Sequence, residues 1–114
     1  MEDCLFCKIA AGEIPSNKVF EDDKVLAFYD ISPQAPKHVL VIPKKHFNNL
    51  MELETEDSEL LMHVFKTITR VAGETGIDKP GFRVVINTGK DGQQSVEHLH
   101  FHVLGGRMMN WPPG

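Results

Sequence analysis

Apolar residues recur along this chain with two different periods, one typical of strands and one typical of a helix. Two short apolar runs at residues 25–29 and 39–42 flank a loop, residues 30–36, that contains two prolines. Short apolar runs bounded by proline-containing loops predict strands. Residues 21–23 are all acidic and directly follow an apolar pair, so we expect a short hairpin at the start of the sheet.

The period lengthens over residues 55–75, where apolar positions recur at helical spacing. These positions are Leu60, Leu61, Val64, Phe65, Ile68, Val71 and Ala72. They predict one amphipathic helix with Thr55 as its N-cap and Gly76 as its C-terminal cap. The acidic residues just after Thr55 suit the positive end of the helix dipole.

The period returns to two over residues 82–87 and again over residues 99–104, which predicts two further strands. The order of strands, one long helix and strands favours an α+β fold, in which the helix covers an antiparallel sheet of about five strands. Such a sheet leaves one face or edge poorly covered, so we expect a homodimer. Residues 1–114 are interpreted as a single domain with an N-terminal segment, 1–18, and a C-terminal tail, 107–114.

Composition and charge narrow the class of protein. The 114 residues are 41% hydrophobic and 25% charged, which is typical of soluble globular proteins. The net charge is −4 and the basic residues are scattered, which argues against a nucleic-acid partner but not against a small phosphorylated ligand. No apolar run approaches the length of a membrane span and the acidic start lacks signal-peptide features, so we expect a cytoplasmic protein with no membrane partner.

Histidine and apolar residues alternate from His98 to Leu104. In a strand, this alternation places His98, His100 and His102 on one face and their apolar neighbours on the other. Ordinary surface histidines would give the same pattern, but half of the chain's six histidines at alternate positions weakens that alternative. At roughly 3.3 Å per residue the outer two lie about 13 Å apart, too far to share one metal ion. Because imidazoles titrate near neutral pH, such a row suits phosphoryl or nucleotidyl transfer.

Cys4 and Cys7 form a C-x-x-C pair, and the chain contains no other cysteine. A secreted disulfide framework is therefore excluded. Three interpretations stay open: two thiols without a role, a redox pair, or half of a zinc site. A redox pair lacks its usual βαβ context here. Zinc needs two more ligands, for which His46 and His98 are candidates.

Five motifs stand in one order along almost the whole chain. They are F-Y-D-I-S-P-Q-A-P at 28–36, V-I-P-K-K-H at 41–46, G-Q-Q-S-V at 92–96, H-L-H-F-H-V-L at 98–104 and the terminal W-P-P-G. Together they resemble the histidine triad (HIT) family, in particular its Hint branch of histidine triad nucleotide-binding proteins. Such matches in one order are far more specific than the three histidines alone.

The resemblance implies a homodimeric α+β hydrolase that cleaves purine nucleoside phosphoramidates and related nucleoside monophosphate conjugates. His100 would be the nucleophile of a nucleotidyl-histidine intermediate that water then hydrolyses, and His102 would contact the phosphate. The other implied substrate contacts are Asp30 at the ribose hydroxyls, Ile31 at the base, Asn87, Gln94 and Ser95 around the ribose, phosphate and leaving group, and Trp111 in a tail that reaches the partner's active site.

The resemblance also implies a zinc ion. Many relatives carry the cysteine pair, and in them histidines at the positions of His46 and His98 complete the site with Cys4 and Cys7. Such a closed site would be structural, with no organic cofactor implied, and would fix His98 beside the nucleophile. Two alternatives remain: a nucleotide-binding or regulatory module without useful catalysis, and a zinc-dependent hydrolase, which requires an open metal position.

Some positions stay open. Gln93 stands where the branch commonly has a second glycine, so the resemblance does not fix the path of this loop. Asp30 and Ser95 each also suit a turn-capping role. We expect His38, beside a proline turn, and His63, on the polar side of the helix, at the surface.

Overall fold

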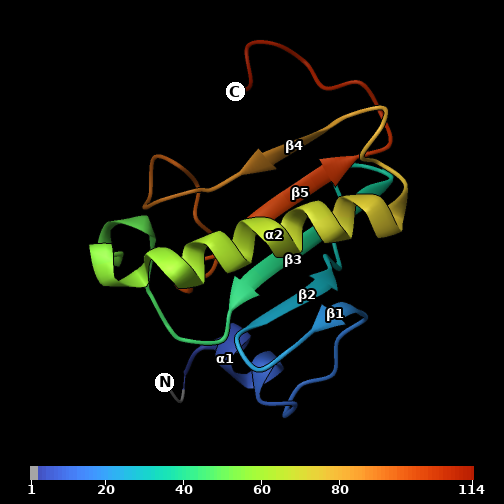
Figure 1. Cartoon of the computed structure of the whole chain (residues 1–114). Helices are drawn as coiled ribbons and strands as arrows, with labels where there is room; N and C mark the ends of the chain where they lie inside the picture. The colour runs from blue at the N-terminus through green and yellow to red at the C-terminus, as the bar shows by residue number, and fades with distance from the viewer. Residues whose placement is uncertain (1–2) are drawn as a thin grey trace.

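The computed structural model describes residues 3–114, so the first two residues of the predicted N-terminal segment lie outside the described residues. Five strands form one antiparallel sheet in the order β1-β2-β3-β5-β4 (Figure 1). Their bounds are Lys18–Glu21 for β1, Val25–Tyr29 for β2, Lys37–Pro43 for β3, Phe82–Val85 for β4 and Phe101–Gly105 for β5. The predicted α+β fold with one main helix is confirmed.

Two helices cover opposite faces of the sheet. Helix α2, Ser58–Thr75, packs on the odd-numbered residues of the central strands, such as Val41. The short helix α1, Leu5–Ala10, packs through Phe6 on even-numbered residues such as Leu40. Figure 1 shows α2 running across the sheet and α1 near the edge formed by β1 and β2. The sequence did not predict α1 because its six residues are too few to show a helical period.

Two strands are shorter than their apolar pattern predicted. Strand β4 ends at Val85 rather than at residue 87, and β5 begins at Phe101 rather than at residue 99. The reason is pairing: the ladder of β4 with β5 ends where Val85 lies opposite His102, and the ladder of β5 with β3 begins where Phe101 lies opposite Val41. His98 and His100 therefore lie on irregular backbone just before β5.

Helix α2 begins later than predicted. Thr55 is the first residue of a 3-10 turn, Thr55–Asp57, and is not the N-cap of the helix. Glu54 and Asp57 form a reciprocal capping box in which the Asp57 carboxylate accepts from the Glu54 N–H at 2.9 Å. The carboxylates of Glu54 and Asp57 therefore accept from backbone N–H groups at the start of this turn, where the Thr55 hydroxyl was expected to do so. The predicted C-terminal cap is confirmed, because Gly76 has left-handed backbone with φ 78°.

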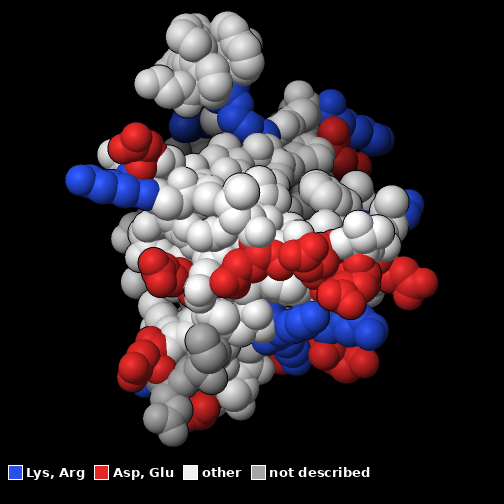
Figure 2. Space-filling view, turned by 90° about the vertical axis from the view of Figure 1, so that its left-hand side faces the viewer, with Lys and Arg blue, Asp and Glu red and all other residues white. Residues whose placement is uncertain are grey.

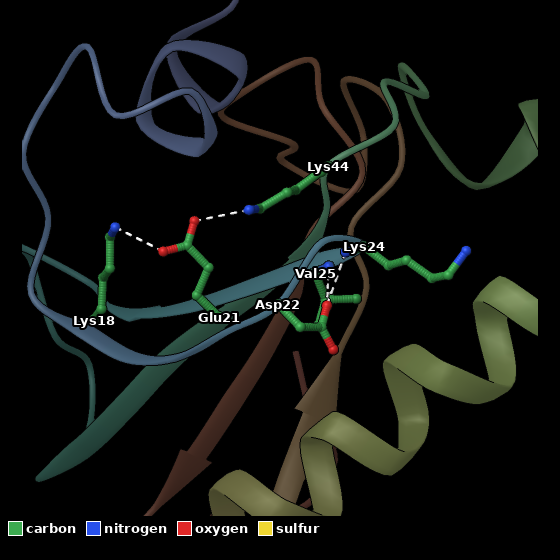
Figure 3. Close-up of polar contacts among 6 residues, drawn as sticks. All are labelled: Lys18, Glu21, Asp22, Lys24, Val25 and Lys44. Carbon is green, nitrogen blue, oxygen red and sulfur yellow. Dashed lines mark hydrogen bonds and ion pairs between the residues drawn. The ribbon is translucent and has the colours of Figure 1, made fainter.

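An aspartate fixes the predicted turn between β1 and β2 (Figure 3). Asp22 Oδ1 accepts from the backbone N–H groups of Lys24 and Val25 at 2.8 and 2.9 Å. Its other oxygen lies 2.7 Å from Nε2 of His63 on α2. The turn is thereby joined to the helix, and His63, whose side chain is 38% exposed, lies at the surface as expected.

Charged side chains are interspersed on the surface. Glu21 accepts from Lys18 and Lys44, each at 2.8 Å (Figure 3), and these two hydrogen bonds lower the pKa of its carboxyl. On the face in Figure 2, acidic and basic groups lie side by side without a continuous basic area. Within residues 3–114, no helix has the length and apolar character needed to cross a membrane.

The loop at residues 88–94 contains a strained position. Gln93 has φ 60°, the one positive φ of a non-glycine residue in the described chain. A Cβ makes left-handed backbone unfavourable, whereas glycine adopts it freely. Glycine is the residue that this backbone favours, which explains why the resemblance led us to expect glycine where this chain has Gln93.

We expect Gln93→Gly to raise the free energy of unfolding by about 0.5–1 kcal/mol, because the relieved strain exceeds the extra chain entropy of glycine. Chemical denaturation measures the change. Gly89→Ala is the matched control: its φ is 71° and an added Cβ meets no atom within 4 Å, so strain alone should lower stability. A less stable Gln93→Gly protein would contradict the prediction.

The outer strand β4 and the tail expose apolar side chains. Phe82 is 37% exposed, Met108 93% and Trp111 81%. The tail follows β5 and turns past β4 (Figure 1). Trp111 contacts Arg83, whose guanidinium carbon lies 5.8 Å from the ring centre. Within its own chain, the tail therefore leaves its largest side chain uncovered.

Candidate functional site

The three alternating histidines face away from α2, as their period predicts. Their apolar neighbours in β5 enter the core beneath α2. The rings of His100 and His102 lie 5.0 Å apart on the opposite face. His98 lies on the same side, since its ring and that of His100 are 6.0 and 5.1 Å from the ring of Phe6 in α1. Phe6, which the sequence analysis did not select, thus covers two of the three rings.

A cavity of about 200 Å³ opens beside His100 and His102. It brings together five of the predicted site residues: Asp30, Ile31, Ser95, His100 and His102. The rest of its lining is largely apolar and comes from Leu5, Phe6, Ile9, Phe28, Tyr29, Leu40 and Val96. An apolar pocket with a few polar groups at one end is the usual arrangement of a small-molecule site.

Three residues predicted to contact substrate do not line this cavity. The amide of Gln94 is used within the chain: Nε2 donates to two backbone carbonyls, at 2.6 and 3.0 Å, and Oε1 accepts from a backbone N–H at 3.0 Å. Asn87 is half-buried, and Trp111 is exposed on the tail. Their contacts with substrate stay predictions.

Asp30 has two roles in the lining of the cavity. Its Oδ1 accepts from the Ser32 N–H at 2.8 Å, which is the turn-capping contact that the sequence left open. Its Oδ2 lies 3.5 Å from His38 Nε2. One carboxylate therefore caps the turn and still lines the cavity.

A backbone hydrogen bond fixes the tautomer of His100. Its Nδ1 lies 2.6 Å from the carbonyl oxygen of His98. Because a carbonyl can only accept, Nδ1 carries the proton and Nε2 of the neutral ring is a bare nitrogen. His100 is 3% exposed, and burial lowers its pKa, partly offset by this hydrogen bond. A neutral imidazole with a free Nε2 has the lone pair that a nucleophile requires.

His38 was expected at the surface, and that prediction was wrong because the residue is 4% exposed. Strand β3 begins at Lys37, so His38 lies inside the strand on the same face as Leu40. The Gln34 N–H donates to His38 Nδ1 at 3.0 Å, which places the proton of the neutral ring on Nε2. This fourth ring was missed because the apolar run that was interpreted as a strand begins only at residue 39.

The Nε2 proton of His38 in turn determines the tautomer of His102. His38 Nε2 lies 2.9 Å from His102 Nδ1 and donates to it. Neutral His102 therefore carries its proton on Nε2, a buried atom with no hydrogen-bond partner among the described residues. His102 also lines the cavity, which makes this unpaired N–H the candidate donor to an oxygen of a bound ligand.

Burial keeps these rings neutral. It is the largest cause of the fall in the pKa of His102 to about 4, followed by the charges of His100 and His38. Burial also lowers the pKa of His38, although Asp30 opposes it, and that of His98, although the carbonyl of Pro43 opposes it. The site is therefore a chain of neutral donors and acceptors at pH 7.

Stability should fall as the pH is lowered from about 6.5 to about 4. In this range the histidines of the unfolded chain become protonated, whereas His38 and His102 of the folded protein stay neutral because their pKa values are lowered. The unfolded state therefore binds more protons. Each excess proton changes the free energy of unfolding by about 1.4 kcal/mol per pH unit. Denaturation of metal-free protein at several pH values measures the slope. His102→Gln should flatten it, and an unchanged slope in that variant would contradict the prediction.

Two cysteines and two histidines meet beside α1. Cys4 is the N-cap of this helix and accepts from the Cys7 N–H at 3.3 Å, while His46 follows β3 and His98 precedes β5. Their Sγ and Nδ1 atoms all lie within 4.8 Å of one another. The fold thus gathers the four residues that the sequence proposed as ligands.

The geometry of this group fits zinc. Nδ1 of His46 and Nδ1 of His98 are 3.1 Å apart, and Sγ–Nδ1 distances are 3.3 Å for Cys7 with His46 and for Cys4 with His98. Bond lengths of about 2.1 and 2.3 Å in a tetrahedral zinc site separate neighbouring donors by about 3.4–3.8 Å, so the described group is slightly tighter. The Nε2–H of His98 donates to the Pro43 carbonyl at 2.8 Å, which leaves Nδ1 free as a ligand.

The protonation of the two cysteines depends on whether a metal ion is bound. Both are free thiols. Burial raises the pKa of the Cys7 thiol to about 11, and the hydrogen bond and charge of Cys4 add to this effect. A bound metal reverses it, because thiolates are the form that coordinates. Two sulfurs and two imidazoles form the donor set of closed, structural zinc sites.

A second group, Asp30, His38 and His102, also has its donor atoms within 4.8 Å. Hydrogen bonds explain it without a metal. His38 Nδ1 accepts from a backbone N–H, so Nε2 is protonated and has no lone pair for a cation. We interpret this group as the hydrogen-bond chain that orients His102.

A period-two row of histidines beside an apolar cavity, on a five-stranded antiparallel sheet, is the arrangement of a histidine triad protein. A family model described as the HIT domain matches residues 11–109. The chain belongs to this family, as the motifs predicted.

Known proteins agree with this assignment. A HIT family hydrolase from Legionella pneumophila has a TM-score of 0.96 and 51% identity, covering 98% of this chain and 100% of that chain. Adenylylsulfatase HINT1 of Arabidopsis thaliana is 51% identical over 112 residues, covering 96% of this chain and 76% of that protein. A 14 kDa zinc-binding protein of Brassica juncea is 51% identical over 114 residues, covering 98% and 100%. The chain thus has the fold of HIT family hydrolases.

Proposed function

We propose that this protein is a nucleoside phosphoramidase-type hydrolase, which cleaves purine nucleoside phosphoramidates or related nucleoside monophosphate conjugates through a nucleotidyl-His100 intermediate. The observation that carries the proposal is the hydrogen bond from His100 Nδ1–H to the His98 carbonyl, which leaves a bare Nε2 beside the cavity. The pocket offers Ile31 and its apolar neighbours to the base and Asp30 to the ribose hydroxyls.

In the first step, His100 Nε2 attacks phosphorus, and a nitrogen–phosphorus bond to the enzyme forms as the bond to the leaving amine breaks. The Nε2–H of His102 donates to a phosphoryl oxygen, where negative charge grows. Ser95 lines the cavity and its hydroxyl can donate a hydrogen bond to the leaving amine, which departs as the neutral amine with a proton from solvent, while Gln94 supports this loop. Water then attacks phosphorus, and the nucleoside monophosphate leaves as His100 is regenerated. The attacking water of this second step returns a proton to solvent.

Zinc belongs to the proposal as a structural ion held by Cys4, Cys7, His46 and His98. The donor geometry supports it, and one relative is named a zinc-binding protein. When bound, the ion would join α1 to the segment before β5. It would thereby hold His98, whose carbonyl fixes the tautomer of His100.

We also propose a homodimer in which the sheet continues across the outer strand β4. The exposed Phe82 on this strand and the exposed Trp111 on the tail support it. In the dimer, the tail would reach the partner's active site, where Trp111 would contact the leaving group.

The main competitor is a nucleotide-binding module without catalysis, and a zinc-dependent hydrolase is the second. A turnover assay separates them, with an adenosine phosphoramidate, a dinucleoside polyphosphate, a nucleotide sugar and adenylyl sulfate compared side by side. Adenylyl sulfate is included because of the name of the Arabidopsis relative. We expect the fastest turnover with the phosphoramidate. Nucleotide binding without turnover of any of the four would favour the binding module. Activity that persists after complete removal of zinc would exclude the zinc hydrolase.

A further inference from the structure

We infer that Asn48 is a positioning residue for the metal, because it fixes the tautomer and orientation of the ligand His46. The inference rests on the proposed zinc site. His46 Nε2 lies 2.8 Å from Asn48 Oδ1. An amide oxygen can only accept, so His46 donates through Nε2–H and presents the lone pair of Nδ1 to the other ligands. That Nδ1 lies 3.3 Å from Cys7 Sγ and 3.1 Å from His98 Nδ1.

Glu52 determines which way the Asn48 amide points. Asn48 Nδ2 donates to Glu52 Oε2 at 3.2 Å, and the Asn48 backbone N–H donates to Oε1 of the same carboxylate. A carboxylate cannot donate, so the amide nitrogen faces Glu52 and the amide oxygen faces His46. A chain of hydrogen bonds therefore runs from Glu52 through Asn48 to His46.

The two histidine ligands differ in what orients them. His98 donates to the backbone carbonyl of Pro43 at 2.8 Å, a contact that survives any substitution that preserves the fold. His46 depends on a side chain. Groups that orient metal-bound histidines typically change metal affinity 10- to 100-fold when they are removed. Substitution of Asn48 should therefore change the zinc affinity of this site while all four ligands stay in place.

The backbone of Asn48 has a separate role that the test must leave intact. Its carbonyl accepts from Gln94 Nε2 at 2.6 Å, which anchors the loop that carries Ser95. Substitution of the Asn48 side chain leaves this carbonyl in place. Asn48→Ala thus tests the contact with His46 separately from the contact with the loop.

The experiment is a competition titration of zinc against a chromophoric chelator, with the full-length protein. We expect Asn48→Ala to bind zinc about 10- to 100-fold more weakly than the parent protein. Asn49→Ala is the matched control, because Asn49 caps the 3-10 turn Leu50–Glu52 through the Met51 N–H at 2.8 Å and lies in the same segment. It should bind zinc within about twofold of the parent.

A charge-swapped double variant tests orientation directly. In Asn48→Asp with Glu52→Gln, the new glutamine amide can donate to the new aspartate, whose other oxygen accepts from His46 Nε2–H. The double variant should regain affinity to within about threefold of the parent. The absorption bands of bound cobalt(II) should match the parent in the double variant and in Asn49→Ala, and shift in Asn48→Ala.

Two results would overturn the inference: zinc affinity of folded Asn48→Ala within twofold of the parent, or a folded double variant as weak as Asn48→Ala. Thermal unfolding of the metal-free proteins shows which variants are folded. If the parent protein itself bound no zinc, the proposed metal site would be wrong. That result differs from one in which the parent binds zinc and only the relative zinc affinities of the variants disagree with the inference.

Discussion

His100→Gln should lower kcat for an adenosine phosphoramidate by about a thousandfold or more, while the affinity for the nucleoside monophosphate stays within about threefold. Glutamine is close in size to histidine but has no nucleophilic nitrogen, so the covalent step is lost and the apolar pocket remains. Steady-state kinetics measures the first quantity and calorimetric titration the second.

The control for this variant is His63→Gln. His63 lies on α2, beneath the opposite face of the sheet, and contacts Asp22 rather than the cavity. It should retain turnover close to that of the parent. Turnover of His100→Gln within tenfold of the parent would contradict a nucleophilic role.

Loss of the metal should have the second largest effect. We expect Cys4→Ala with Cys7→Ala to lose zinc and, at zinc 100- to 1,000-fold above the parent dissociation constant, to lower the free energy of unfolding by about 3–4 kcal/mol. The ion binds only when the fold brings α1, His46 and His98 together, so its binding energy is folding energy. Metal analysis and denaturation with defined free zinc measure both effects.

Metal-free parent protein is the matched comparison for the cysteine variant. Because the variant also removes the Cys4 cap of α1, it should unfold at the same denaturant concentration as the metal-free parent or slightly below it. The site is accessible to a chelator, because Cys4 and His46 line an open cavity of about 640 Å³. Equal stability of the parent protein with and without zinc would contradict a structural role.

The sequence predicted features that repeat along the chain. The faces of the strands follow from a period of two, which is why His100 and His102 could be placed opposite the core beneath α2. The α+β order followed from the change of period at residue 55. The four candidate metal ligands were proposed from residue chemistry and family resemblance, and the fold does bring them together.

The structure was needed for features that depend on pairing between distant segments. His38 was misplaced because the start of β3 is set by the register in which Lys37 lies opposite Gly105, and no local signal reveals that register. The same holds for the helix cap at Asp57 and for Gln94, whose amide bonds to the backbone of a segment 46 residues away. Tautomers, which decide the chemistry here, depend on these long-range contacts.

The most direct test of the account is to identify the covalent intermediate. Wild-type protein is mixed with excess adenosine phosphoramidate, quenched within one turnover, digested under conditions that preserve phosphorus–nitrogen bonds, and mapped by mass spectrometry. The account predicts one adenylyl group on the peptide that contains the histidine row, with fragment ions that assign it to His100, and no such group in His100→Gln. An adenylyl group on another residue, or rapid turnover with no labelled peptide at any quench time, would contradict it.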